Sequence, residues 1–257
     1  MQNISISSKT LNIVISFFAA ILFFQIMSLL TSVTQGHSIY WFFHVFGGGS
    51  GGIVYLKMTM YTAFTFGLLE LWEQHKLLLR ENEYQKLDIL PRQDQRVLTP
   101  PEVEDIKLNI IRLEQSGLRY VMMDFTKKAT TQFRNNLNIS DTIQVLDGEF
   151  ESTQTKHEGN LEMVRYLIQT VPMLGFIGTI VELTSALQLI GTGTLKDLEN
   201  VRMAMSGAFD ATVVALTLTM VLTYFYHRYI GQLDMFFGEM KSFIYENLIS
   251  RIYQKPK

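Results

Sequence analysis

Residues 171–190 read VPMLGFIGTIVELTSALQLI and form the most informative apolar segment of the chain. Its length of about twenty almost wholly apolar residues is enough for one helical crossing of a bilayer at ~1.5 Å per residue. Gly175, Thr179 and Glu182 are spaced by four and three residues, so they share one face of the predicted helix. An ionised side chain near the bilayer centre costs ~3 kcal/mol or more, so it normally faces protein or water. The stretch therefore predicts a membrane helix that packs against other helices.

The composition of the whole chain also indicates a membrane protein. Of its 257 residues, 47% are hydrophobic, and the formal net charge is only −2. The chain is too apolar for an ordinary soluble domain, and it has no basic field that would attract nucleic acid. It contains no cysteine, which excludes disulfides, thiolate metal sites and cysteine nucleophiles. We expect neither a metal site nor another cofactor.

Three further apolar stretches complete a four-span arrangement in the lipid bilayer. Residues 11–33 carry no charge and form the first predicted span, and residues 53–72 form the second. A secretory signal is the alternative for the first stretch, but the apolar run is too long and no small-residue cleavage site follows it. The fourth predicted span is residues 208–226, reached from residue 190 through a short turn at residues 191–196.

The distribution of Lys and Arg predicts the topology. The connection at residues 34–52 contains no Lys, Arg, Asp or Glu, whereas most basic residues lie within 73–170 or after His227. The positive-inside rule therefore places these two basic regions, and both termini, in the cytoplasm. Lys57 lies near the start of the second span, so we expect its amine to extend outward to the membrane surface.

The predicted fold is an all-α integral membrane bundle with a cytoplasmic helical domain. The predicted domains are an N-terminal hairpin (1–72), the cytoplasmic domain (73–170), a core channel hairpin (171–226) and a C-terminal cytoplasmic helix (227–257).

The cytoplasmic domain is predicted to contain three helices. A capping box with proline at the first helical position, residues 99–102 (TPPE), starts a helix that stops at Gly117. A second helix follows from Leu118. The third is expected to begin after Ser140 and to continue without a break into the membrane. No catalytic motif is found in this domain.

The span at residues 208–226 carries polar residues on two faces. Asp210 and Thr217 are seven residues apart on one face, whereas Thr212, Thr219 and Thr223 lie on nearly the opposite face. Threonine hydroxyls often bond back to their own helix, which explains any one of them. An acid together with polar groups on two faces favours a helix that faces a partner on one side and a pore on the other.

Two motifs resemble those of the MotA/TolQ/ExbB proton-channel family. Residues 172–179, PMLGFIGT, are similar to the family signature P-x-L-G-x-x-G-T, and residues 206–216, SGAFDATVVAL, resemble its other core helix. The resemblance covers roughly residues 164–230. The four predicted spans are more like MotA than like the three-span TolQ and ExbB.

The resemblance implies a homopentamer in the bacterial inner membrane around a single-span partner of the MotB/TolR/ExbD type. Ion flow through such a complex moves one part against the other and so does mechanical work. On this basis Thr179 and Thr212 correspond to the pore-facing threonines. The further candidates are Asp210, Glu182 and Thr219 for the ion pathway and Pro172, Gly175 and Gly178 for helix packing.

The chain departs from the family pattern at three positions. The glutamate that TolQ-like proteins place five residues before the second threonine is Gly207 here, and Asp210 is a candidate to replace it. The proline of the last span is Val221, and Glu182 stands where a glycine is usual. These departures leave the choice between H⁺ and Na⁺ open.

Two classes of function remain open from the sequence. The first is an ion-conducting subunit, and the second is a non-conducting membrane scaffold that has kept the bundle. The acids and threonines on interior faces favour the first, because a scaffold has little reason to bear their desolvation cost. An enzyme is not expected, since no nucleophile–base pair can be assembled.

Overall fold

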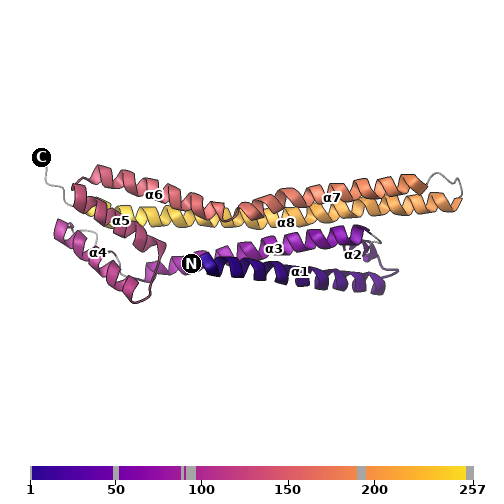
Figure 1. Ribbon diagram of the computed structural model, residues 1–257, viewed down its shortest axis with the longest axis horizontal. Helices are drawn as coiled ribbons and strands as arrows, with labels where there is room; N and C mark the ends of the chain where they lie inside the picture. The colour runs from indigo at the N-terminus through magenta and orange to yellow at the C-terminus, as the bar shows by residue number, and fades with distance from the viewer. Residues whose placement is uncertain (1, 49–51, 88–89, 91–96, 190–194, 253–257) are drawn as a thin grey trace. The chain divides into compact units, whose positions relative to one another are not determined.

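The computed structural model describes residues 2–48, 52–87, 90, 97–189 and 195–252. Four helical stretches among these residues are long and apolar enough to cross a membrane, namely Lys9–Val33, Gly52–Tyr84, Ile139–Gln188 and Phe209–Arg251. Apart from turns and one isolated bridge between Leu98 and Ile252, the described residues are helical (Figure 1). The prediction of an all-α membrane bundle is confirmed, and the chain is a multi-pass membrane protein.

The chain folds into two compact units. Unit 1 comprises Met1–Glu73 and Leu161–Arg228, and unit 2 comprises Gln74–Asn160 and Tyr229–Lys257. Unit 1 thus combines the two predicted membrane hairpins, and unit 2 combines the predicted cytoplasmic domain with the C-terminal helix.

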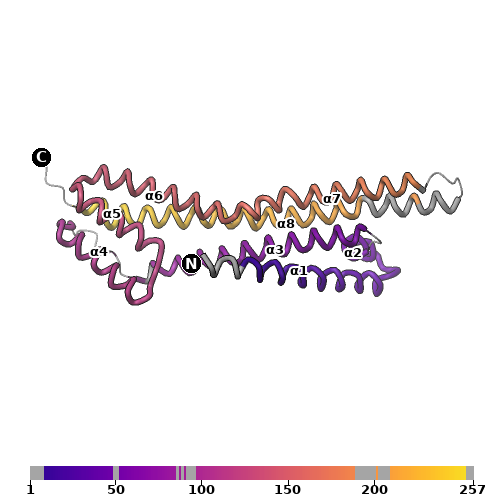
Figure 2. Tube along the Cα trace, in the orientation of Figure 1, coloured from indigo at the N-terminus to yellow at the C-terminus, as the bar shows by residue number. Residues whose placement is uncertain are grey.

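Unit 1 is built from two helical hairpins and one short helix. Figure 2 traces α1 beside α3 and α7 beside α8. The helices that contribute are α1 (Gln2–Val33), α2 (Tyr40–Gly47), the first part of α3 (Gly52–Glu81), α7 (Glu162–Leu189) and the first part of α8 (Leu195–Asn247). The helix α2 lies in the aromatic connection between the first two spans. Most of the predicted turn at residues 191–196 lies outside the described residues.

A common apolar core joins the helices of unit 1. It includes Ala20 of α1, Val45 of α2, Met60 of α3, Val171 of α7 and Val214 of α8. The short helix α2 is therefore part of the packed interior and does not merely lie at the interface. Its last residues are buried in this core, and the side chains of Lys57 and Tyr61 of α3 donate hydrogen bonds to their carbonyls.

Much of the apolar surface of unit 1 remains exposed. On α7 and α8 the exposed residues include Met173, Phe176, Ile180, Leu216 and Met220. A soluble monomer rarely exposes so large an apolar surface. In a membrane protein such a surface faces lipid or neighbouring subunits.

Unit 2 contains α4 (Pro100–Gln115), α5 (Val121–Asn136), α6 (Ile139–Gly159), the short helices η1 (Asn82–Lys86) and η3 (Ile249–Arg251), and the ends of α3 and α8. The Glu102 carboxylate accepts a 2.8 Å hydrogen bond from the Thr99 backbone N–H, as the predicted capping box requires. The helix α4 ends just before Gly117, whose φ of 91° favours glycine.

One predicted helix is interrupted. The expectation that the third cytoplasmic helix runs from Ser140 into the membrane without a break is wrong. The helix α6 ends at Gly159 and α7 begins at Glu162. Gly159 and Asn160 are both weak helix formers, and glycine is the weaker of the two, which explains why the chain turns here.

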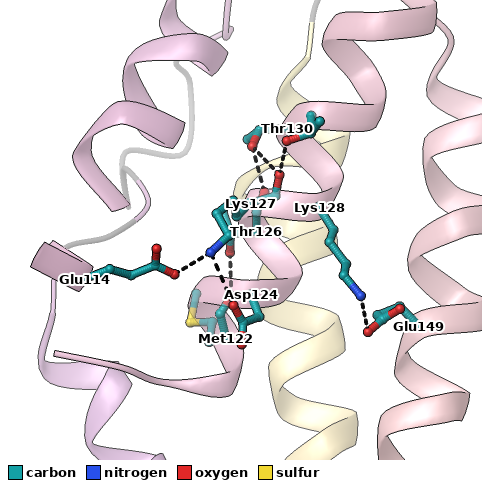
Figure 3. A network of polar contacts seen from close by, with 9 residues as sticks. Glu114, Met122, Asp124, Thr126, Lys127, Lys128, Thr130 and Glu149 are labelled. Carbon is teal, nitrogen blue, oxygen red and sulfur yellow. Dashed lines mark hydrogen bonds and ion pairs between the residues drawn. The ribbon is translucent and has the colours of Figure 1, made fainter. Parts of the chain in front are cut away.

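Ion pairs, which Figure 3 shows, hold α5 to its neighbours together with aromatic packing. The Lys127 amine lies 2.5 Å from the Glu114 carboxylate and 3.4 Å from that of Asp124. The hydrogen bond from Lys127 to Glu114 raises the pKa of the Lys127 amine, so this amine stays charged at neutral pH. Phe125 also stacks on Phe150 of α6 at 4.0 Å between ring centroids. These contacts have a structural role.

Candidate ion pathway

Thr179 of α7 and Thr212 of α8 lie against each other. Their hydroxyl oxygens are hydrogen-bonded, and either one can be the donor. Both hydroxyls also approach the backbone carbonyl of Gly175, at 3.3 Å from Thr179 and 3.1 Å from Thr212. The structure therefore brings the two predicted threonines together in a small polar site between apolar helices. Their role in ion passage stays a prediction.

Small residues allow α7 and α8 to come this close. A Cβ atom added at Gly175 would lie 2.5 Å from the Cβ of Ala215, and one at Gly178 would lie 2.7 Å from the Cδ2 of Leu56. At Gly175 the neighbouring atoms cannot move aside by a side-chain rotation, so this position requires glycine, whereas at Gly178 the flexible Leu56 side chain would have to shift. Both contacts are made within one chain, between α7 and either α8 or α3. Pro172 lies one turn earlier inside α7, where it removes one backbone hydrogen bond.

The two acids of the candidate pathway lie near the threonine pair in sequence and near each other in space. Asp210 precedes Thr212 by two residues, and its side chain is 13% exposed. Glu182 follows Thr179 by three residues and is partly buried. The two carboxylates interact electrostatically with one another. A third residue, Lys57, interacts with both of them.

The expectation that Lys57 extends outward is wrong. Its side chain is almost fully buried, and its amine donates hydrogen bonds to the carbonyl oxygens of Val45 at 2.7 Å and Gly48 at 2.8 Å. These carbonyls lie at the C-terminal end of α2, where helical carbonyls have no partner within the helix. The inward position supplies two acceptors and two opposite charges, so the amine gains nothing by reaching the membrane surface.

His44 is the second residue that the sequence analysis missed. It lies on α2, and its Nδ1 atom is 3.5 Å from the Asp210 Oδ2 atom, while its side chain is 44% exposed. Neither His44 nor Lys57 belongs to a motif with the acids. In the sequence, the only features that could have pointed to these two site residues were a lysine within a predicted span and a histidine within an aromatic connection.

The remaining threonines of α8 differ in their surroundings. Thr217 is exposed and donates to the Val213 carbonyl at 2.8 Å, which is ordinary bonding back to its own helix. The hydroxyl oxygen of Thr219 is buried and has no hydrogen-bond partner among the residues that the structure describes. A buried hydroxyl without a partner costs ~1–3 kcal/mol, so Thr219 stays a candidate for a site that meets water or an ion.

One of the three comparisons with known proteins finds a match. Residues 118–242 match the model of the MotA/TolQ/ExbB proton channel family. The match includes α7, the threonine pair and both acids, and it extends well beyond the two motifs that first indicated the resemblance. A search of curated proteins and a search of solved structures find no match.

Proposed function

The chain belongs through residues 118–242 to the MotA/TolQ/ExbB proton channel family, and from this premise we propose that it is an ion-conducting stator subunit. The family consists of proton-channel-type membrane subunits of energy-transducing complexes, and its members are not enzymes. In our proposal the complex lies in the bacterial inner membrane and is a homopentamer around a single-span partner. Ion flow through it does mechanical work on the envelope.

The observation that carries the proposal is the contact between Thr179 and Thr212. Each hydroxyl offers one donor and two acceptor lone pairs, so the pair can hold water or a hydrated ion without adding fixed charge. A carboxylate of the partner that passes this site could take a proton from one side and release it to the other. The bonds to the Gly175 carbonyl also suit a non-conducting scaffold, but a scaffold has little reason to bear the desolvation cost of Asp210 and Glu182 between its helices.

We expect reporter fusions to show both basic regions of the chain in the cytoplasm. Fusions near residues 90 and 240 should report a cytoplasmic location, because both positions belong to unit 2 and lie in basic regions. Fusions near residues 48 and 195 should report the opposite side, since the contact between His44 and Asp210 joins the outer ends of both hairpins. A periplasmic signal at residue 90 would exclude the four-span arrangement.

We also expect the chain to purify as a homopentamer with a single-span partner. The exposed apolar residues of α7 and α8 support this expectation, because they offer surface for contacts with neighbouring subunits. Affinity purification from native membranes in mild detergent, followed by native mass spectrometry, measures the stoichiometry and identifies the partner by its mass. A stable monomer without a partner would contradict the proposal.

A further inference from the structure

Four titratable side chains from four helices gather at the α2 end of unit 1. They are His44 of α2, Lys57 of α3, Glu182 of α7 and Asp210 of α8. The His44 ring lies 3.5 Å from the Asp210 carboxylate, and the Lys57 ammonium interacts electrostatically with both acids. We call these four residues the charge cluster.

The positive charge in the charge cluster is held in a fixed position. Lys57 is 1% exposed, and its amine is hydrogen-bonded to two carbonyls of the tightly packed end of α2. A lysine at the surface could swing away from an approaching cation. Lys57 cannot do so without breaking its hydrogen bonds to the buried Val45 carbonyl and the partly buried Gly48 carbonyl, which is unfavourable.

A fixed ammonium acts differently on a metal cation and on a proton. A hard metal cation needs several oxygen ligands at once, and it is repelled by a positive charge a few ångströms away. A proton needs a single lone pair, which it can find on one carboxylate or imidazole atom. His44 is partly exposed to solvent and its Nδ1 atom lies 3.5 Å from the Asp210 carboxylate, so its ring can contact both water and that acid.

We propose that Lys57 is a specificity-determining residue that makes the pathway selective for protons. Its ammonium keeps Na⁺ away from Asp210 and Glu182. A proton passes from the Nδ1 atom of protonated His44 to the Oδ2 atom of Asp210, which leaves a neutral imidazole and a neutral carboxylic acid. The inference rests on the proposed ion-conducting function and assigns its ion.

A purely structural role for Lys57 predicts a different result. A variant at Tyr61 distinguishes this structural role from the proposed electrostatic one. The Tyr61 hydroxyl donates to the Phe46 carbonyl at 2.6 Å and is also buried, so it holds the same end of α2 without a charge. If Lys57 only fixes α2, then Tyr61→Phe should alter ion selectivity as Lys57→Gln does. If the charge matters, Tyr61→Phe should stay proton-selective.

The test measures H⁺ and Na⁺ flux in vesicles that contain the complex purified through this chain. Lys57→Gln keeps a hydrogen-bond donor and removes the charge, so we expect the ratio of Na⁺ to H⁺ flux to rise at least ~10-fold. Tyr61→Phe should leave the ratio unchanged. In the wild-type complex, replacing Na⁺ with choline at constant pH should not change the flux, and this measurement needs no variant to fold.

Three results would overturn the inference. They are Na⁺-dependent flux in the wild type, a proton-selective Lys57→Gln variant, and an equal change in the ratio of Na⁺ to H⁺ flux in Lys57→Gln and Tyr61→Phe. The proposed function fails separately, if loss of the Thr179 and Thr212 hydroxyls leaves the flux intact. The two claims can therefore be told apart. If the flux is lost without these hydroxyls but the Lys57→Gln variant stays proton-selective, only the role of Lys57 is refuted.

Discussion

Replacing Thr179 and Thr212 together with valine is expected to abolish ion flux and to leave the assembled complex intact. Valine keeps the shape of threonine and removes only the hydroxyl. The hydroxyls bond to each other and to one carbonyl, so removing both leaves little buried polarity unpaired. If each hydroxyl stabilises a charged group that passes the site by ~1.5 kcal/mol or more, the flux should fall by ~100-fold or more when both are removed. Ion flux in vesicles measures the effect.

Thr217→Val is the matched control for this double variant. Thr217 lies on the same helix, but it is exposed and bonds only to the carbonyl one turn before it. The control should conduct like the wild type. Native mass spectrometry of each variant confirms that the subunit count is unchanged. If the double variant assembles correctly and conducts normally, the channel proposal fails and the scaffold alternative takes its place.

The parts of the structure that the sequence predicted are those set by local spacing. Membrane spans follow from the length of apolar runs, and four of the described helices reach that length. Thr179 and Thr212 were identified as candidates from two motifs, each of which is contained in one helix. Gly175 lies one helical turn before Thr179, so the same motif supplies both the polar group and the room for the neighbouring helix.

The parts that the sequence did not predict depend on partners from distant segments. Lys57 was expected to extend outward because it lies near the start of the second predicted span. Its partners are carbonyls at the end of a short helix that was not predicted, together with acids more than a hundred residues later. Helical periodicity assigns residues to faces of one helix, but it does not say which helices meet. The charge cluster therefore became visible only in the structure.

Gly175→Ala is expected to force α7 and α8 apart and to destabilise unit 1. The added methyl group would lie 2.5 Å from the Ala215 Cβ and 3.3 Å from the Thr212 Cα. The second contact is to backbone, so rotating a side chain cannot relieve it. Overpacking of this kind costs ~1–3 kcal/mol, and it should also separate the two threonine hydroxyls. Thermal unfolding of the detergent-solubilised complex should show a lower midpoint, and ion flux should fall with it.

Two further variants decide whether the helix contact is the cause. In the double variant Gly175→Ala/Ala215→Gly, the methyl group moves from α8 to α7 across the same contact, so the close 2.5 Å approach disappears and much of the stability should return. Gly231→Ala introduces the same change on α8 where no atom lies within 4 Å, and there alanine should be neutral or slightly stabilising because it favours a helix. If all three variants melt alike, Gly175 is not needed for close packing. If Gly175→Ala alone melts early and Ala215→Gly rescues both stability and flux, the contact that positions the threonine pair is also the contact that holds the two channel helices together.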